Sequence, residues 1–133
     1  MKYIFLLCSF LVLSMLAQAQ SKTAIINLLR QKQVTQLMQY CDLPFCLNVG
    51  SKDDNRAITD KAVLKKALET LVNRHYFDDF FKKGKSSTNN ESVSYLLATY
   101  NGKEQTFIST SIVFQFKQLA NKKLLLETIR IAG

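Results

Sequence analysis

Two spacings of hydrophobic residues divide this chain. Over residues 25–41 and 63–81 the apolar side chains recur mostly every three or four positions, which is typical of helices that bury one face. From residue 92 onward apolar and polar side chains alternate, which is typical of strands with one buried face. Helices followed by neighbouring strands predict an α+β fold, in which N-terminal helices pack on an antiparallel sheet.

The first helical region begins at Ser21 or Thr23, because either hydroxyl can cap a helix. Its apolar positions run from residue 25 to residue 41 with one step of five residues. That irregular step predicts a kink or break near residues 31–33.

The second helical region begins at Thr59 or Asp60 and keeps a 3.6-residue period over residues 63–75. The aromatic segment at residues 76–81 is expected to add one or two helical turns that place its rings on the core. Residues 84–90 contain a glycine, serines and asparagines and are expected to form a loop.

The segment around Pro44 separates the two helical regions. Residues 43–49 are expected to form a short strand that starts at the proline, and residues 50–56 a polar loop. Two alternatives hold for Cys41 and Cys46. In an oxidising compartment they could bond to each other. A strand would instead turn their side chains apart and leave two small buried hydrophobic residues.

Three β-rich runs follow, at residues 92–100, 106–117 and 123–131. Asn101-Gly102 supplies a hairpin turn between the first two, because both residues tolerate positive φ. Residues 119–122 supply the second turn. The pattern therefore predicts a C-terminal three-stranded antiparallel meander.

Neither phase of the third strand is wholly apolar. Placing Ile129 and Ile131 inward also places Glu127 inward, whereas the opposite phase brings in Arg130. A buried charge is costly unless it is paired or hydrated, so either phase indicates a water-lined pocket. The alternative is that the charged side chain lies at the sheet margin and reaches solvent.

Residues 1–19 have the features of a secretory signal peptide. Lys2 precedes an apolar run at residues 4–16, and Ala17-Gln18-Ala19 provides small residues before a cleavage point. The run is too short to span a bilayer. Cys8 lies inside it after two leucines, which does not fit a lipoprotein signal.

Cleavage would leave a single domain at residues 20–133, exported to the periplasm or the cell exterior, with no membrane span. The whole chain has a formal net charge of +8, and removal of the leader takes away one lysine and leaves +7. Such a charge favours acidic partners, but the lysines are spread along the chain as on solvated surfaces. No nucleic-acid partner is expected, because no arginine and aromatic interleaving is present.

The order of these elements resembles the nuclear-transport-factor-2-like (NTF2-like) superfamily, which includes ketosteroid-isomerase-like and polyketide-cyclase-like proteins. The resemblance rests on Leu28-Leu29 and Leu37-Met38 in the first helical region, Leu43-Pro44-Phe45, Ala62-Val63-Leu64, and Ile129-Arg130-Ile131 at the end. It is strongest with uncharacterised secreted members of Bacteroidetes type. It implies a cone-like, cystatin-like domain. In such a domain a curved sheet wraps around a long helix and leaves a conical cavity.

A small ligand bound in that sheet-lined cavity is the function that the resemblance and the residues favour, without catalysis. The candidate pocket residues are His75, Tyr76, Phe77, Tyr95, Phe114, Glu127 and Arg130. No catalytic residue, metal site or cofactor is expected. His75 is the only histidine, and adjacent Asp78 and Asp79 diverge on a helix. The alternative is an envelope interaction module, whose cavity is filled and whose sheet face forms a homodimer. An isomerase or cyclase is the least favoured class.

Overall fold

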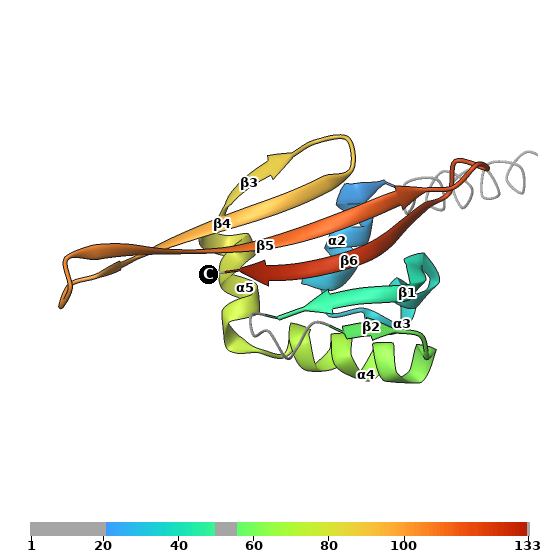
Figure 1. Ribbon diagram of the computed structural model, residues 1–133, viewed down its shortest axis with the longest axis horizontal. Coiled ribbons are helices and arrows are strands. Elements are labelled where there is room, and N and C mark those ends of the chain that lie inside the picture. The colour runs from blue at the N-terminus through green and yellow to red at the C-terminus, as the bar shows by residue number, and fades with distance from the viewer. Residues whose placement is uncertain (1–20, 50–55, 133) are drawn as a thin grey trace, which may run out of the picture.

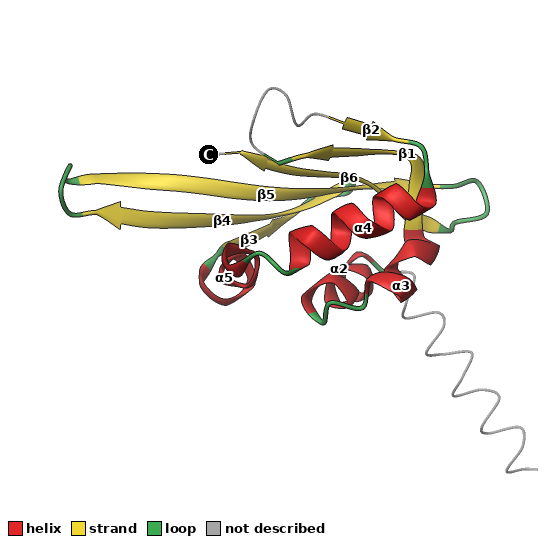
Figure 2. Cartoon of the chain, turned by 90° about the horizontal axis from the view of Figure 1, so that it is seen from below, coloured by secondary structure: helices red, strands yellow, loops and turns green. Residues whose placement is uncertain are grey.

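Helices cover one face of an open, six-stranded sheet in the computed structural model, which describes residues 21–49 and 56–132 (Figures 1 and 2). The elements are α2 (Lys22–Arg30), α3 (Val34–Leu37), η1 (Met38–Tyr40, a 3₁₀ turn), β1 (Cys41–Asn48), β2 (Arg56–Ile58), α4 (Lys61–Val72), α5 (His75–Lys83), β3 (Lys85–Thr88), β4 (Ser92–Asn101), β5 (Thr106–Gln118) and β6 (Leu124–Ala132). The strand order is β2-β1-β6-β5-β4-β3. The predicted α+β fold is confirmed. The predicted signal peptide and residues 50–55 of the predicted loop lie outside the described residues.

The helical region follows the sequence prediction closely. The Ser21 hydroxyl accepts a hydrogen bond from the Ala24 amide at 3.1 Å and caps α2. Asp60 caps α4, because its carboxylate accepts from the Ala62 and Val63 amides at 2.8 and 3.1 Å. The predicted break is confirmed between α2 and α3, where Lys32 has a φ of 58°.

The predicted meander is also confirmed, since β4 pairs antiparallel with β5 and β5 pairs antiparallel with β6. The sheet as a whole is mixed, because β1 runs parallel to β6. A turn at residues 102–105 joins β4 to β5, directly after Asn101.

Neither predicted phase holds along the whole of β6, because the strand contains a β-bulge at Glu127. Phe116 pairs with Leu126 and Gln115 pairs with Thr128, so Glu127 is an extra residue. The inward side therefore shifts by one position, and Leu126 and Ile129 are both fully buried. No charged side chain is fully buried among the described residues: Glu127 is half-buried and Arg130 is exposed.

Three other predictions are wrong. β1 begins at Cys41, three residues before Pro44, and is an interior strand. Proline has no backbone N–H and cannot donate a hydrogen bond to a neighbouring strand. Pro44 is tolerated here because the pairing of β1 with β6 is irregular between Cys41 and Cys46. Two short strands, β2 and β3, form in segments predicted as loops or left unassigned.

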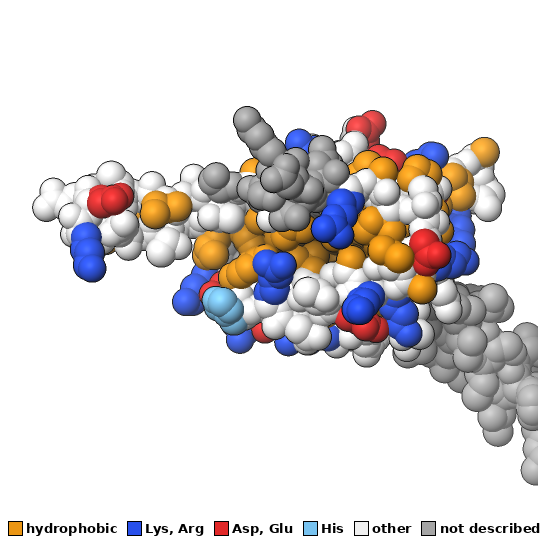
Figure 3. Space-filling view, turned by 60° about the horizontal axis from the view of Figure 1, so that its bottom comes forward, with side chains coloured by type: hydrophobic (Ala, Val, Ile, Leu, Met, Phe, Trp, Pro, Cys, Tyr) orange, Lys and Arg blue, Asp and Glu red, His pale blue; other side chains and the backbone are white. Residues whose placement is uncertain are grey.

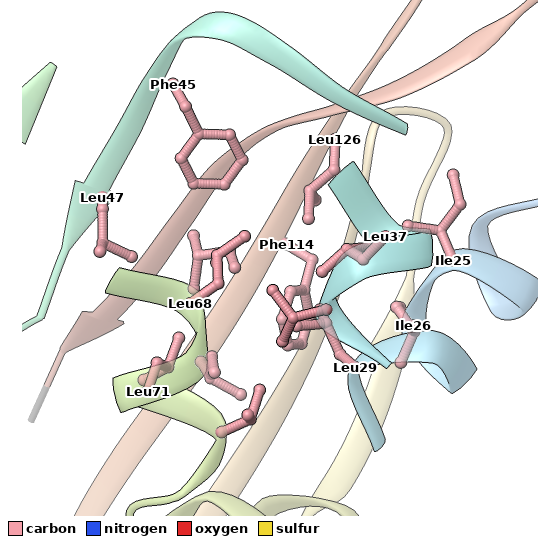
Figure 4. Packing of buried hydrophobic residues seen from close by; sticks show 14 of the residues in the cluster. Ile25, Ile26, Leu29, Leu37, Phe45, Leu47, Leu68, Leu71, Phe114 and Leu126 are labelled. Atoms are coloured by element: carbon pink, nitrogen blue, oxygen red, sulfur yellow. The ribbon is translucent and has the colours of Figure 1, made fainter. Parts of the chain in front are cut away.

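The core lies between the helices and the sheet. It includes Ile25, Ile26 and Leu29 of α2, Leu37 of α3, Phe45 and Leu47 of β1, Leu68 and Leu71 of α4, Phe114 of β5 and Leu126 of β6 (Figure 4). Every helix thus presents its apolar positions to the sheet, as the 3.6-residue period requires.

The hairpin of β4 and β5 extends beyond the rest of the sheet (Figure 1). We call residues 96–111 the arm, because β3 pairs with β4 only as far as Leu96 and β6 pairs with β5 only as far as Ser111. Within the arm, Tyr100 pairs with Phe107 across the strands, and their ring centroids are 5.1 Å apart.

Candidate functional site

Two adjoining hollows open on the helical side of the sheet. The first, of about 250 Å³, lies between α4 and the β1–β2 pair, and the second, of about 470 Å³, lies between α5 and strands β4, β5 and β6. Both are lined by Val49 and Arg74, so we describe them together as the groove. Figure 3 shows apolar side chains exposed in a hollow on this side of the molecule, with basic side chains at its rim.

The lining of the groove is mostly apolar. The first hollow is lined by Leu47, Val49, Arg56, Ile58, Val63, Ala67, Thr70, Leu71 and Arg74. The second is lined by Val49, Arg74, Tyr76, Phe80, Leu97, Thr110 and Ile131. A few polar groups set in an apolar hollow are typical of small-molecule sites.

Helical spacing explains one wall of the groove. Val63, Ala67 and Thr70 lie three or four residues apart and therefore share a face of α4. On the opposite wall, Leu47 and Val49 are two residues apart and point to the same side of the sheet. The groove is thus a continuation of the core that the helices leave uncovered.

Two arginines bring positive charge to this apolar surface. Arg56 lies in β2 opposite Leu47, and Arg74 lies just before α5 with its guanidinium carbon 5.9 Å from the centre of the Tyr76 ring. Among residues 21–49 and 56–132, no acidic residue lines either hollow, although Asp60 lines a further hollow that also includes Arg56. The two ion pairs recorded within residues 21–49 and 56–132 are Lys32–Asp78 and Lys117–Asp42, and neither involves these arginines.

The seven candidate pocket residues do not lie around one pocket in the structure. Tyr76 alone lines the groove. Phe77 and Phe114 are fully buried in the core, and Tyr95 packs against Phe81 with ring centroids 4.9 Å apart. His75 is exposed and has its ring edge-on to Tyr76.

The two charged candidates lie elsewhere. Arg130 is exposed and, between the buried Ile129 and Ile131, projects from the opposite face of the sheet. Glu127 lines a separate, more polar hollow of about 630 Å³ together with Lys22, Lys117 and Lys122.

Sequence reasoning missed Arg56 and Arg74. A signal for Arg74 was present, because it follows Leu71 by three residues and so continues the apolar stripe of α4. Arg56 carried no such signal, because it lay in a segment predicted to be a loop.

Cys41 and Cys46 are free thiols in the structure, which does not support the alternative of a disulfide between them. The Cys41 thiol donates to the Leu37 carbonyl at 3.5 Å, and burial raises its pKa to about 12. Cys46 is exposed, so the alternative of two buried cysteines is wrong for this residue.

Within residues 21–49 and 56–132, no group of three or more His, Cys, Asp or Glu side chains could hold a metal ion. No helix in the same ranges has the length and apolar character needed to cross a membrane.

No protein-family model matches the chain, and no curated protein matches it. Solved structures do match. An NTF2-like protein of unknown function from Cytophaga hutchinsonii is 11% identical, with 80% of each chain covered and a TM-score of 0.45. ActVI-ORFA from Streptomyces coelicolor is 14% identical over 91% of this chain and 93% of its own, with a TM-score of 0.46.

An NTF2-like protein with a cystatin-like fold from Novosphingobium aromaticivorans is 10% identical over 96% of this chain and 86% of its own, with a TM-score of 0.40. All three TM-scores are below 0.5. At such identities these matches say nothing about a ligand or an activity.

Proposed function

We propose that this protein binds a small, partly apolar molecule in the groove and does not transform it. The observation that carries the proposal is the junction at Val49 and Arg74, where the two hollows adjoin to give a continuous, mainly apolar surface. Exposed apolar surface of this kind costs free energy in water, and a ligand that covers it removes part of that cost.

The composition of the groove supports binding without catalysis. General acid–base chemistry requires a side chain such as histidine or a carboxylate within hydrogen-bond reach of the reacting atom. Among the described residues that line the groove, none is a histidine or a carboxylate. His75, the only histidine, is exposed next to Tyr76 and does not line either hollow.

Nile red, an uncharged dye that fluoresces in apolar surroundings, tests the proposal. Val49→Trp would fill the junction of the hollows and is expected to abolish saturable dye binding. Thr88→Trp adds the same side chain to the exposed strand β3 and serves as the matched control. Equal dye binding by the wild type and the Val49→Trp variant would contradict the proposal.

The arm supports a second candidate function, that of an interaction module. Five large hydrophobic residues are exposed among the described residues, and four lie on the arm: Leu96, Tyr100, Phe107 and Ile108. Beyond Leu96 and Ser111 the outer backbone edges of the arm also have no neighbouring strand within the described sheet. An edge of this kind can pair with a strand of another protein or of a second copy.

Light scattering over a range of protein concentrations separates this candidate from the first. A Tyr100→Ser, Phe107→Ser double variant is expected to remove concentration-dependent association. Val63→Ser is the control, because Val63 is the fifth exposed hydrophobic residue and lies outside the arm. A wild-type protein that stays monomeric at all concentrations would argue against a homodimer.

A further inference from the structure

We infer that the ligand of the groove is an amphiphile with a single carboxylate head group, held by Arg74 and Arg56. This inference rests on the proposed ligand-binding function and specifies its chemistry. It is drawn from the combination of an apolar lining with two guanidinium groups, and no acidic side chain is among the described residues that line the two hollows.

The apolar lining indicates that most of the ligand is hydrophobic. Side chains of Leu47, Ile58 and Leu71 line the first hollow, and those of Phe80, Leu97 and Ile131 line the second. Volumes of about 250 and 470 Å³ lie around the lower part of the usual range for small-molecule sites, so a flexible chain or a small ring system fits better than a large ligand. An unbranched acyl chain is flexible enough to occupy two hollows that share lining residues.

The arginines set the charge of the head group. A guanidinium group presents parallel N–H donors that match the two oxygens of a carboxylate. Arg74 lines both hollows, and its guanidinium carbon lies 5.9 Å from the centre of the Tyr76 ring, which lines the second hollow. Arg56 lines the first hollow from β2 on the other wall.

The positive net charge of the whole chain also favours an anionic ligand. A formal net charge of +8 raises the local concentration of anions near the surface. Two arginines beside hydrophobic side chains do not suit a polyanion, which is held by many cationic contacts along its length. The combination therefore points to one negative charge on an otherwise apolar molecule.

Three ten-carbon probes that differ only in the head group test this inference: decanoate, 1-decanol and decyltrimethylammonium. Binding would be measured by NMR titration of backbone amides on the full chain, with the signals of groove residues such as Val49 followed. Decanoate is expected to bind about tenfold more tightly than the cationic probe, a ratio typical of one charge-assisted hydrogen bond. High salt should weaken decanoate binding and leave 1-decanol binding unchanged.

Arginine variants localise the head group. Arg74→Gln and Arg56→Gln are each expected to weaken decanoate binding about three- to fivefold, since both arginines are exposed and partly screened by solvent. Neither variant should change the affinity for 1-decanol. Arg130→Gln is the matched control, because Arg130 is an exposed arginine on the opposite face of the sheet.

The outcomes separate the two proposals. Equal binding of all three probes at the groove would overturn the head-group inference and leave the ligand-binding function standing. Selective decanoate binding that Arg130→Gln weakens as much as Arg74→Gln would also overturn it, because the effect would then come from overall charge. Absence of any groove shift with all three probes, together with unchanged dye binding in the Val49→Trp variant, would overturn both.

Discussion

The same substitution at two phenylalanines of β5 should lower stability strongly at one position and hardly at the other. Phe114 is fully buried, stacks with Phe81 at 6.2 Å between ring centroids, and pairs with Ile129 in β6. Phe107 lies on the arm and is 75% exposed. Both residues occupy the same antiparallel strand, so differences in backbone propensity largely cancel.

The magnitudes follow from burial. Removing a buried phenylalanine ring costs about 3–5 kcal/mol, because transfer free energy and ring contacts are lost and a cavity remains. An exposed substitution usually changes stability by about 0.5 kcal/mol or less. Since domains of this kind unfold with only about 5–15 kcal/mol, Phe114→Ala should lose a large part of the total stability.

Urea unfolding followed by circular dichroism measures both variants. With a denaturant slope of about 2 kcal/mol per molar, Phe114→Ala should lower the midpoint by about 2 M, and Phe107→Ala should leave it nearly unchanged. Phe114→Leu provides a milder change if the alanine variant is unfolded in buffer. Similar costs for Phe114→Ala and Phe107→Ala at a protein concentration low enough to prevent association would refute the burial argument.

Three further predictions concern capping, thiol chemistry and processing. Asp60→Ala should lower the free energy of unfolding by about 1 kcal/mol in urea titrations, whereas Asp60→Asn should keep most of the cap; equal losses would contradict the capping role. Iodoacetamide at neutral pH should modify Cys46 and spare Cys41 until the protein unfolds, as read by mass spectrometry. The pKa of Cys41 is about 12 in the folded protein against an ordinary value of 9.0, so the thiol ionises first in the unfolded state. The free energy of unfolding should therefore fall as the pH rises from about 9. Cys41→Ala should remove this part of the pH dependence. Expression in a Gram-negative host with intact export should yield a periplasmic protein that begins at Gln20, and an intact N-terminus recovered from the cytoplasm would contradict the signal-peptide proposal.

The helical half could be predicted because local chemistry decides it. The caps at Ser21 and Asp60 require only side chains next to the helix start, and the break after α2 is visible as one irregular step in the apolar spacing. The meander was predictable for a similar reason, since its strands are long and Asn101-Gly102 marks a turn.

The short strands could not be predicted from hydrophobic alternation. All four residues of β3 are exposed, so no burial pattern marks them, and β2 contains only three residues. The bulge at Glu127 was missed because a single extra residue shifts the inward face, and a strictly alternating pattern then places a charge inside.

The candidate site required tertiary information. Arg56 and Arg74 belong to different elements and line the first hollow together only because β2 pairs with β1 beside α4. The aromatic candidates Phe77 and Phe114 were chosen as pocket residues, but the structure uses them to fill the core. Sequence spacing identifies which side chains face inward and does not tell whether the interior is packed or hollow.

The polar composition of β3 has a consequence for how the molecule behaves at high concentration. An outermost strand offers a row of backbone groups that can recruit further chains and start fibre growth. β3 carries one lysine and three hydroxyl side chains, all exposed, which makes this boundary a poor template for such growth. Polymerisation through this side of the molecule is thereby discouraged, whereas the arm, with its exposed hydrophobic side chains and edges that are unpaired within the described sheet, lacks this protection.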